Sequence, residues 1–174
     1  GIVLNYGQSP LVKTKYQEFY KDENCYGVNT IVAIGCYGGY NVEDAILVNK
    51  GAIDRGLFRT TYYSTYETRE ESSHVKGNNV NSKFMNVEKM DVERKKYDHD
   101  YSHLTDSGII QENTKLHDKV IIIGKVTVDA ENVNSYFDAS IKTKRDQRGF
   151  VDKTFISDDE EGFRLAKVRI RDER

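Results

Sequence analysis

Two segments near the end of the sequence alternate apolar and polar residues with a period of two, and this pattern constrains the fold more than any other. They are Gly149–Ile156 and Phe163–Ile170, joined by the acidic connection Asp158–Gly162. Such alternation is typical of strands with one buried face, and the short connection predicts a hairpin. Lys119–Val128 is a further strand or strand pair, broken at Gly124. Since no long stretch repeats with a helical period, we expect a mostly β fold with few short helices.

The first third of the chain holds shorter apolar segments. Residues 1–30 are polar and mixed, which predicts a loop followed by a short strand or an irregular arm. Ile31–Ile34 is rich in β-branched residues, so we expect a fully buried strand there. After a second apolar run at Ala45–Asn49, the segment Gly51–Phe58 indicates a short helical turn closed by glycine. Thr60–Thr68 has the strongest strand propensity in the chain.

The segment Arg69–Lys83 contains only two strongly apolar residues, Val75 and Val80. Burying it would release too little free energy to offset an ordering cost of about 1–2 kcal/mol per residue. We therefore expect an exposed loop or a mobile hairpin tip, whose shortening leaves the thermal midpoint nearly unchanged.

The composition fits one domain, or two small ones, of 174 residues with a lean hydrophobic core. A net charge of −2 excludes proteins that bind nucleic acid through overall positive charge, so any such binding needs a local site. Two cysteines, Cys25 and Cys36, are too few for a disulfide framework or a four-cysteine zinc site. No segment resembles a signal peptide or a membrane-spanning run, so we expect a soluble, intracellular protein. The chain opens at Gly1 and stops at Arg174 inside a strand-like pattern, which suggests a fragment of a longer protein.

The clearest candidates for chemistry are two adjacent carboxylates, Glu43 and Asp44, which follow the flexible turn Gly38–Val42 between apolar runs. Neighbouring residues on an extended chain point in opposite directions, so the pair is unsuited to act as one acid–base dyad. Mg²⁺ commonly uses one or two protein carboxylates together with substrate phosphates, and these residues are able to reach a hydrated ion directly or through water. The alternative is structural: both side chains cap the next element or are solvated in a loop.

Two histidines, His99 and His103, have a spacing that lets both imidazoles share one helix face and a metal. The sequence offers neither a matching cysteine pair nor a third clear ligand, so two exposed histidines in a polar loop are the favoured interpretation. Cys36 has no adjacent histidine, which favours a buried thiol over a nucleophile.

The glycines at 35, 38 and 39 match neither a dinucleotide-binding motif nor a phosphate-binding loop, so they indicate backbone clearance in a turn. The basic run Lys142–Arg148 is able to contact phosphate, yet such runs are usually solvated surfaces. The composition does not decide between these two interpretations of the run.

One longer pattern resembles a known family. Gly39–Asn49 contains a Gly-Tyr-Asn-x-Glu-Asp core and is followed by an Ile-Asp-Arg-Gly-Leu-Phe-Arg block at 53–59. This combination resembles the second-largest (β-like) subunit of multisubunit DNA-directed RNA polymerases. The similarity is of eukaryotic, archaeal or large-DNA-virus type rather than bacterial. Further segments with the same resemblance are Pro10–Leu11, Asn29–Ile34, Leu104–Ile110, Asp118–Lys125, Gly149–Asp152 and Ala166–Arg171.

The resemblance implies a domain organisation and a site. Residues 1–59 would form part of a barrel-like hybrid-binding domain, and residues 60–174 a β-rich wall (flap) domain. Glu43 and Asp44 would be the catalytic and metal-binding residues of this chain, near the second Mg²⁺, which arrives with the nucleotide. The tightly held Mg²⁺ would belong to the largest subunit.

The resemblance also implies partners: the largest polymerase subunit and the smaller ones, the DNA template, the RNA–DNA hybrid, ribonucleoside triphosphates and transcription factors, with no membrane. The location would be the nucleus in a eukaryote, and a cytoplasmic factory or the virion for a virus. The family has a loop whose lysines face the nucleotide and the RNA end, and this loop should begin just after Arg174. The family's triphosphate-binding arginine should precede Gly1. The isolated chain is therefore expected to be inactive and to bind nucleic acid weakly.

The leading interpretation is a piece of a second-largest polymerase subunit that contributes to the active centre and the hybrid path during template-directed RNA synthesis. Two alternatives stay open. One is a free-standing β-rich interaction module that docks transcription factors without catalysis. The other is a split subunit whose second half is a separate chain.

Overall fold

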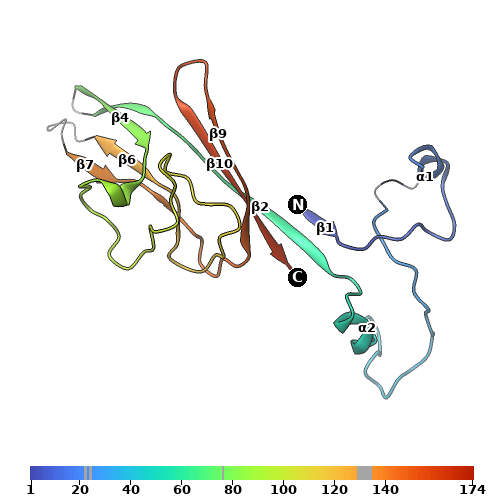
Figure 1. Cartoon of the computed structure of the whole chain (residues 1–174). Helices are drawn as coiled ribbons and strands as arrows, with labels where there is room; N and C mark the ends of the chain where they lie inside the picture. The colour runs from blue at the N-terminus through green and yellow to red at the C-terminus, as the bar shows by residue number, and fades with distance from the viewer. Residues whose placement is uncertain (22, 24, 76, 129–134) are drawn as a thin grey trace. The chain divides into compact units, whose positions relative to one another are not determined.

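The computed structural model describes residues 1–21, 23, 25–75, 77–128 and 135–174. Within them the chain is mostly β with few short helices, as the sequence predicts (Figure 1). Contacts divide it into two compact units: unit 1 comprises Gly1–Tyr62 with Glu173–Arg174, and unit 2 comprises Tyr63–Asp172. The described residues form open antiparallel sheets and no closed barrel, so the barrel-like form expected for the first segment is not found.

One four-stranded sheet has the order β1-β2-β10-β9. Its strands are β1 (Ile2–Leu4), β2 (Thr60–Arg69), β9 (Phe150–Asp158) and β10 (Arg164–Glu173). The hairpin expected from the period-two pattern is confirmed, because β9 and β10 pair antiparallel. In β10 the alternation buries Val168 and Ile170, whereas Lys167 and Arg169 keep contact with solvent.

A second sheet has the order β3-β4-β6-β7, and a third joins β5 to β8. Their strands are β3 (Ser72–Val75), β4 (Asn78–Phe84), β5 (Ile121–Ile123), β6 (Lys125–Val128), β7 (Tyr136–Asp138) and β8 (Ile141–Lys142). The break expected at Gly124 is confirmed, because β5 and β6 belong to different sheets. A Cβ atom at Gly124 would overlap the carbonyl oxygen of Met85, whose amide donates to the Gly124 carbonyl at 3.1 Å. Glycine is therefore required where the chain passes between the sheets.

The hydrophobic core of unit 2 consists of two clusters that meet at β5. Ile122 lies in the larger cluster with Val151 and Ile170, whereas Ile121 lies in the smaller one. Both isoleucines are fully buried. The smaller cluster also contains Val87, Val92, Tyr101, Leu104 and Val126. The apolar run that the sequence marks as a strand is thus the centre of the core.

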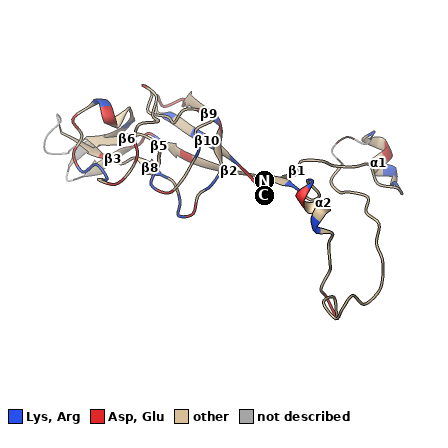
Figure 2. Ribbon diagram, turned by 60° about the horizontal axis from the view of Figure 1, so that its bottom comes forward, with Lys and Arg blue, Asp and Glu red and all other residues tan. Residues whose placement is uncertain are grey.

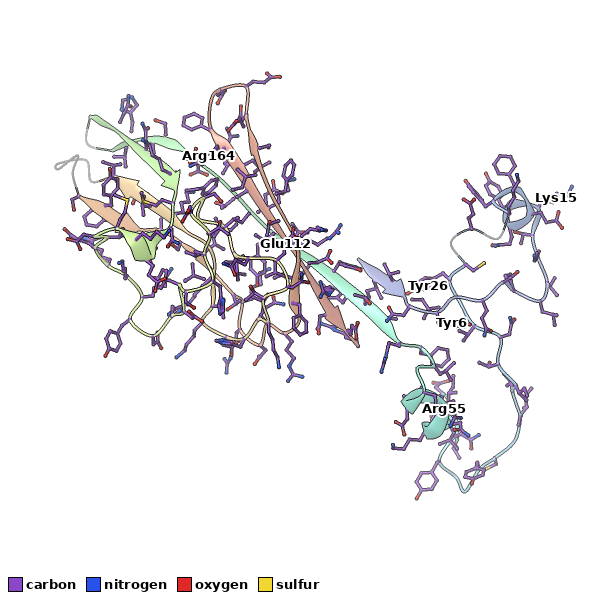
Figure 3. The ribbon with its side chains drawn as sticks, viewed as in Figure 1. Tyr6, Lys15, Tyr26, Arg55, Glu112 and Arg164 are labelled. Carbon is purple, nitrogen blue, oxygen red and sulfur yellow. The ribbon has the colours of Figure 1, made fainter. Side chains whose placement is uncertain are left out.

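A buried ion pair joins the start of β10 to the ends of β2 and β4. The Glu70 side chain is 8% exposed, and its Oε1 accepts hydrogen bonds from Arg164 Nε at 3.0 Å and Nη2 at 2.8 Å. Arg164, at the start of β10, is labelled in Figure 3. The amides of Phe84 and Arg164 also donate to this carboxylate. Burial raises the pKa of the Glu70 carboxyl, but the Arg164 guanidinium and the two amides outweigh burial and hold that pKa below its ordinary value.

The polar segment after β2 is a paired hairpin. Ser73 of β3 lies opposite Val80 of β4, and Ser82–Phe84 pair with β6. Ser82 is buried, and its hydroxyl accepts a hydrogen bond from the Glu71 amide at 2.8 Å. The expectation of an exposed loop is therefore wrong for the base of this hairpin. Backbone pairing and hydrogen-bonded polar groups stabilise it, a role that apolar side chains have elsewhere in the core. Residue 76, between the two strands, lies outside the described residues.

Unit 1 lacks the buried strand expected at Ile31–Ile34. The run is irregular, and its first and last isoleucines are fully exposed. The second apolar run, Ala45–Asn49, is also irregular and exposed. An apolar run is buried only where a second apolar surface packs on it, and the described part of residues 1–62 contributes nothing to either hydrophobic cluster. The buried strand expected from composition is thus wrong for unit 1.

The described residues include three short helices: α1 (Lys15–Phe19), α2 (Lys50–Asp54) and the 3₁₀ helix η1 (Val87–Lys89). The helical turn expected near residue 51 is confirmed as α2. Asn49 caps its start by accepting from the Ala52 amide at 3.0 Å, and Gly56, with a φ of +109°, follows its end. In the part of the chain that is described, no helix is long and apolar enough to cross a bilayer.

Candidate functional site

The acidic pair singled out by the sequence lies in unit 1, directly after a glycine-rich turn. Gly38 and Gly39 have φ angles of +59° and +76°, a left-handed region that glycine adopts without steric cost. The amide of Tyr40 donates to the carbonyl of Tyr37 at 3.1 Å. The glycines that were expected to give backbone clearance therefore reverse the chain just before the carboxylates.

The side chain of Asn41 closes this turn. Its Oδ1 accepts a hydrogen bond from the Tyr37 amide at 2.8 Å, and its Nδ2 donates to the Gly35 carbonyl at 2.6 Å. One carboxamide thus holds both sides of the segment 35–41, which pairs with no strand. The motif spacing did not reveal this role. The signal for it is an asparagine directly after a glycine-rich turn, where its side chain commonly replaces backbone hydrogen bonds.

Glu43 and Asp44 are both exposed at the end of the turn. Glu43 has a φ of +63°, a left-handed conformation that is uncommon for this residue type. Among the described residues, neither carboxylate forms an ion pair or a side-chain hydrogen bond. Of the two structural alternatives, a cap of the next helix is excluded, because Asn49 caps α2, whereas a pair solvated in a loop agrees with the exposure of both residues. Both negative charges are therefore open to an external cation.

Two free carboxylates suit an oxygen-preferring cation such as Mg²⁺, but they do not make a complete site. In the described ranges, no group of three or more His, Cys, Asp or Glu side chains is arranged to hold a metal ion. Mg²⁺ keeps several waters and takes one or two protein carboxylates when substrate phosphates supply further oxygens. The donor set therefore fits an ion that arrives with a phosphorylated ligand better than a resident ion.

His99 and His103 do not share a metal. His99 Nδ1 lies 2.9 Å from Asp98 Oδ1, and His103 Nε2 lies 3.3 Å from Asp100 Oδ2. Both histidines lie outside the helices. The His99 side chain is only 9% exposed, so the expectation of an exposed histidine is wrong at that position. Asp98 also pairs with Lys119, and this contact holds the histidine-bearing segment against the body of unit 2.

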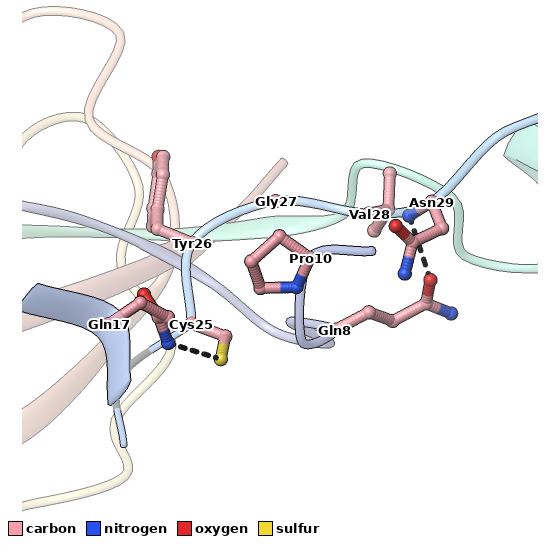
Figure 4. Close-up of a pocket in the computed structure, with 8 residues that line it drawn as sticks. All are labelled: Gln8, Pro10, Gln17, Cys25, Tyr26, Gly27, Val28 and Asn29. Atoms are coloured by element: carbon pink, nitrogen blue, oxygen red, sulfur yellow. Dashed lines mark hydrogen bonds between the residues drawn. The ribbon is translucent and has the colours of Figure 1, made fainter. Parts of the chain in front are cut away.

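Among the described residues, neither cysteine is part of a catalytic arrangement. Cys36 is exposed rather than buried as expected, because the run beside it forms no buried strand. Cys25 is half-buried, and Gln17 donates to its Sγ at 3.5 Å. It lines a cavity of about 170 Å³, shown in Figure 4. The other lining residues are Gln8, Pro10, Gln17, Tyr26, Gly27, Val28 and Asn29. The described residues that line this cavity include no acid, histidine or cation, so we assign it no chemistry.

The sequence has relatives of known identity. The family described as RNA polymerase Rpb2, domain 6, matches residues 1–174. The DNA-directed RNA polymerase II subunit RPB2 of Encephalitozoon cuniculi is 39% identical over 97% of this chain and 15% of its own length. The polymerase subunit Rpo2 of Sulfolobus acidocaldarius is 34% identical over 98% of this chain and 16% of its own. A probable RPB2 homologue of Invertebrate iridescent virus 3 is 34% identical over 96% of this chain and 14% of its own. The chain thus spans about 15% of the length of such relatives.

Proposed function

Because the chain belongs to the RNA polymerase Rpb2 family, we propose that it acts as part of the second-largest subunit of a DNA-directed RNA polymerase in template-directed RNA synthesis. The family match across residues 1–174 is the observation that carries this proposal. The relatives are named as polymerase subunits in a eukaryote, an archaeon and a virus, which gives no support to a free-standing docking module.

We assign residues 1–59 to a hybrid-binding domain and residues 60–174 to a wall domain. The partners of this protein would be the largest and the smaller polymerase subunits, the DNA template, the RNA–DNA hybrid and ribonucleoside triphosphates. Transcription factors would bind the assembled enzyme. The nucleus, or a factory or virion of a virus, would be the place of action, in keeping with the eukaryotic and viral relatives.

The proposed role of Glu43 and Asp44 is to attract the Mg²⁺ that accompanies the incoming nucleotide. Their exposure and their lack of internal partners among the described residues support this role. The bound ion would neutralise triphosphate charge and stabilise the pyrophosphate leaving group. The two carboxylates would contribute negative potential and oxygen ligands, directly or through water, which attract the Mg²⁺ and thereby the triphosphate that carries it.

Asn41 would act as a positioning residue for this pair. Its two hydrogen bonds fix the turn from which the carboxylates project, so their place does not depend on a strand partner. An Asn41→Asp change keeps the acceptor for the Tyr37 amide and loses the donor to the Gly35 carbonyl. The aspartate variant should therefore retain more function than Asn41→Ala.

The test is nucleotide addition by the assembled polymerase at varied Mg²⁺ concentration. We expect Asp44→Ala to slow elongation by about 10- to 100-fold, the usual cost of losing a group that supports a metal-bound ligand. The Mg²⁺ concentration needed for half-maximal rate should rise, and excess Mg²⁺ should restore part of the rate. Assembly with the other subunits should be intact, because the Asp44 side chain has no internal partner among the described residues.

Asp91→Ala is the matched control, since Asp91 is an exposed aspartate of unit 2 for which the structure shows no ion pair with a described residue. Its elongation rate and Mg²⁺ dependence should equal those of the unaltered enzyme. Normal elongation and unchanged Mg²⁺ dependence in Asp44→Ala would remove the assignment of this residue.

A further inference from the structure

The end of β8 and most of its connection to β9 concentrate positive charge in a chain that is negative overall. The seven residues Lys142–Arg148 contain four cations and one acid, Asp146, whereas the whole chain has a net charge of −2. In Figure 2 these cations are among the blue residues of unit 2. We call residues 142–148 the basic loop.

The basic loop has a fixed shape. The buried Tyr66 hydroxyl donates to Gln147 Oε1 at 2.8 Å and accepts from the Lys144 amide at 2.9 Å. The Gln147 amide donates to the Lys144 carbonyl at 3.2 Å, and Asp146 has a φ of +60°, so the loop turns tightly between these residues. Thr143 is buried, and its amide donates to the Val120 carbonyl at 2.9 Å. The cations are therefore presented by an ordered support.

The four cations of the basic loop have exposed side chains and no ion pair with any described residue. The nearest interaction is that of Lys144, whose Nζ lies 5.7 Å from the centre of the Tyr66 ring. Cations on the neighbouring sheet differ, since Lys153 pairs with Glu112 at 3.5 Å and Lys167 with Glu67 at 3.0 Å. The charge of the basic loop is thus available to an external anion.

A neighbouring segment adds a further cation. The Leu116 amide donates to the Gly149 carbonyl at 2.8 Å, and the backbones of Lys115 and Phe150 form an isolated antiparallel β-bridge. Residues 115–117 therefore lie beside the end of the basic loop. Lys115 is exposed and forms no ion pair with a described residue. The acids nearest to Lys115 along the chain are Glu112, which pairs with Lys153, and Asp118. The cationic surface therefore extends beyond one turn, which suits an extended anion.

The acidic tip of the β9–β10 hairpin lies at the far end of β9, whereas Asp152, near the start of β9, pairs with Arg169 at 2.6 Å and with Arg171 at 3.4 Å. β9 runs from Phe150, beside the basic loop, to Asp158, where the acidic tip 158–161 begins. Nine residues of strand span about 30 Å at about 3.3 Å per residue. That distance exceeds the screening length of about 8 Å at physiological ionic strength. The tip therefore does not cancel the attraction of the basic loop for an anion.

We propose that the basic loop binds the phosphodiester backbone of a nucleic acid without reading its sequence. Lys and Arg on an ordered loop supply such contacts, whereas sequence readout needs side chains that reach base edges. An acidic protein segment is the weaker candidate, because protein interfaces rely on buried aromatic or apolar anchors, and residues 142–148 contain none. The proposal is independent of the role given to Glu43 and Asp44.

The test is binding of the 174-residue chain to a 20-nucleotide single-stranded RNA without Mg²⁺, followed by fluorescence anisotropy. We expect dissociation constants above about 1 μM, since only about four phosphates are neutralised. The logarithm of affinity falls with the logarithm of salt concentration with a slope of about −0.7 per neutralised phosphate, so affinity should fall about 50-fold between 50 and 200 mM salt. Duplex DNA of equal length should show a steeper slope, of about −0.9 per phosphate.

Replacing all four cations of the basic loop by Gln should abolish this binding. The matched control replaces four cations that have carboxylate partners by Gln and changes the net charge by the same amount; they are Lys50, Lys89, Lys153 and Lys167. The control should bind within about twofold of the unaltered chain. Equal losses in both variants would show that overall charge alone governs binding and would overturn the proposal.

Two further measurements separate the ordered loop from its alternatives. Tyr66→Phe keeps every charge but removes both hydrogen bonds of the hydroxyl, so it should weaken RNA binding severalfold. Near-ultraviolet circular dichroism checks that each variant is folded. If the fourfold variant is not folded, two double variants replace it: Lys142→Gln with Lys144→Gln, and Arg145→Gln with Arg148→Gln. Each double variant should halve the slope of the logarithm of affinity against the logarithm of salt concentration. A poly-glutamate peptide that binds as tightly as RNA would contradict the preference for phosphodiesters.

Discussion

Single polar side chains fix the conformation of this protein where apolar contacts are few. Asn41 closes the glycine-rich turn before Glu43 and Asp44, the Tyr66 hydroxyl holds the basic loop, and Glu70 joins the ends of three strands. Gln147 is 81 residues from Tyr66, and Arg164 is 94 residues from Glu70. Contacts over such separations leave no local pattern, so the sequence predicts the glycine-rich turn before Asn41 but neither of the two long-range contacts.

The Glu70–Arg164 pair should contribute strongly to the stability of unit 2. We expect Glu70→Ala to lower the free energy of unfolding by about 3 kcal/mol, because it leaves a partly buried guanidinium and two amides without their acceptor. Urea unfolding at pH 7 measures the change. Glu67→Ala, which removes an exposed carboxylate from Lys167, should cost less than about 1 kcal/mol. Equal costs for both variants would contradict the importance of the buried pair.

The same carboxyl should make stability depend on pH. Because the pKa of Glu70 is lower in the folded than in the unfolded state, its contribution is full above the unfolded pKa of about 4.3. The contribution is lost as the pH falls through the lower, folded pKa. Glu70→Gln should therefore show a smaller loss of unfolding free energy between about pH 5 and pH 2 than the unaltered chain. Parallel curves for the two proteins would refute this.

At the scale of elements, the passage from β5 to β6 depends on one glycine. We expect Gly124→Ala to lower the free energy of unfolding by about 1–3 kcal/mol, because the new methyl group overlaps the Met85 carbonyl and forces both segments apart. Thermal unfolding of the full chain measures the effect. Gly27→Ala is the control, since a Cβ there meets no atom within 4 Å. A midpoint for Gly124→Ala equal to that of Gly27→Ala would exclude the proposed clash.

The elements differ in how far the sequence predicts them. The β9–β10 hairpin and the strands around Gly124 were predictable, because their side chains alternate between core and solvent or form the core itself. Ile31–Ile34 was not, since composition shows which residues favour burial and not whether a surface exists to bury them. The β3–β4 hairpin was missed for the opposite reason: backbone pairing stabilises it, and backbone groups are the same in every sequence.

The candidate site was predictable in part. The adjacent carboxylates and the glycine-rich turn are visible in the sequence, and the structure places them together. The closure by Asn41 depends on the angle at which the chain reverses, which residue types alone do not determine. The basic loop was visible as a run of charge, but its order depends on Tyr66, which belongs to a distant strand.

At the scale of the whole molecule, the chain should be inactive alone and active only in an assembly. It spans about 15% of the length of its polymerase relatives, and the described residues contain no complete metal site. We expect no extension of an RNA primer on a DNA template by the isolated chain at any Mg²⁺ concentration. The reconstituted polymerase that contains the same residues should extend the primer. Incorporation of nucleotides by the isolated chain would contradict the prediction that activity requires the other subunits.

The pairing of β2 with β10 also has a consequence for how the protein is made. Thr60, the first residue of β2, and Arg174, which directly follows β10, exchange two backbone hydrogen bonds, of 2.9 and 2.8 Å. At about 5–20 residues per second, a ribosome needs roughly 5–20 s to add the hundred or so residues between them. During that interval one edge of the Thr- and Tyr-rich strand β2 has no partner and is open to pairing with other nascent chains. Yield in the cell should therefore depend on chaperones that shield this strand during translation.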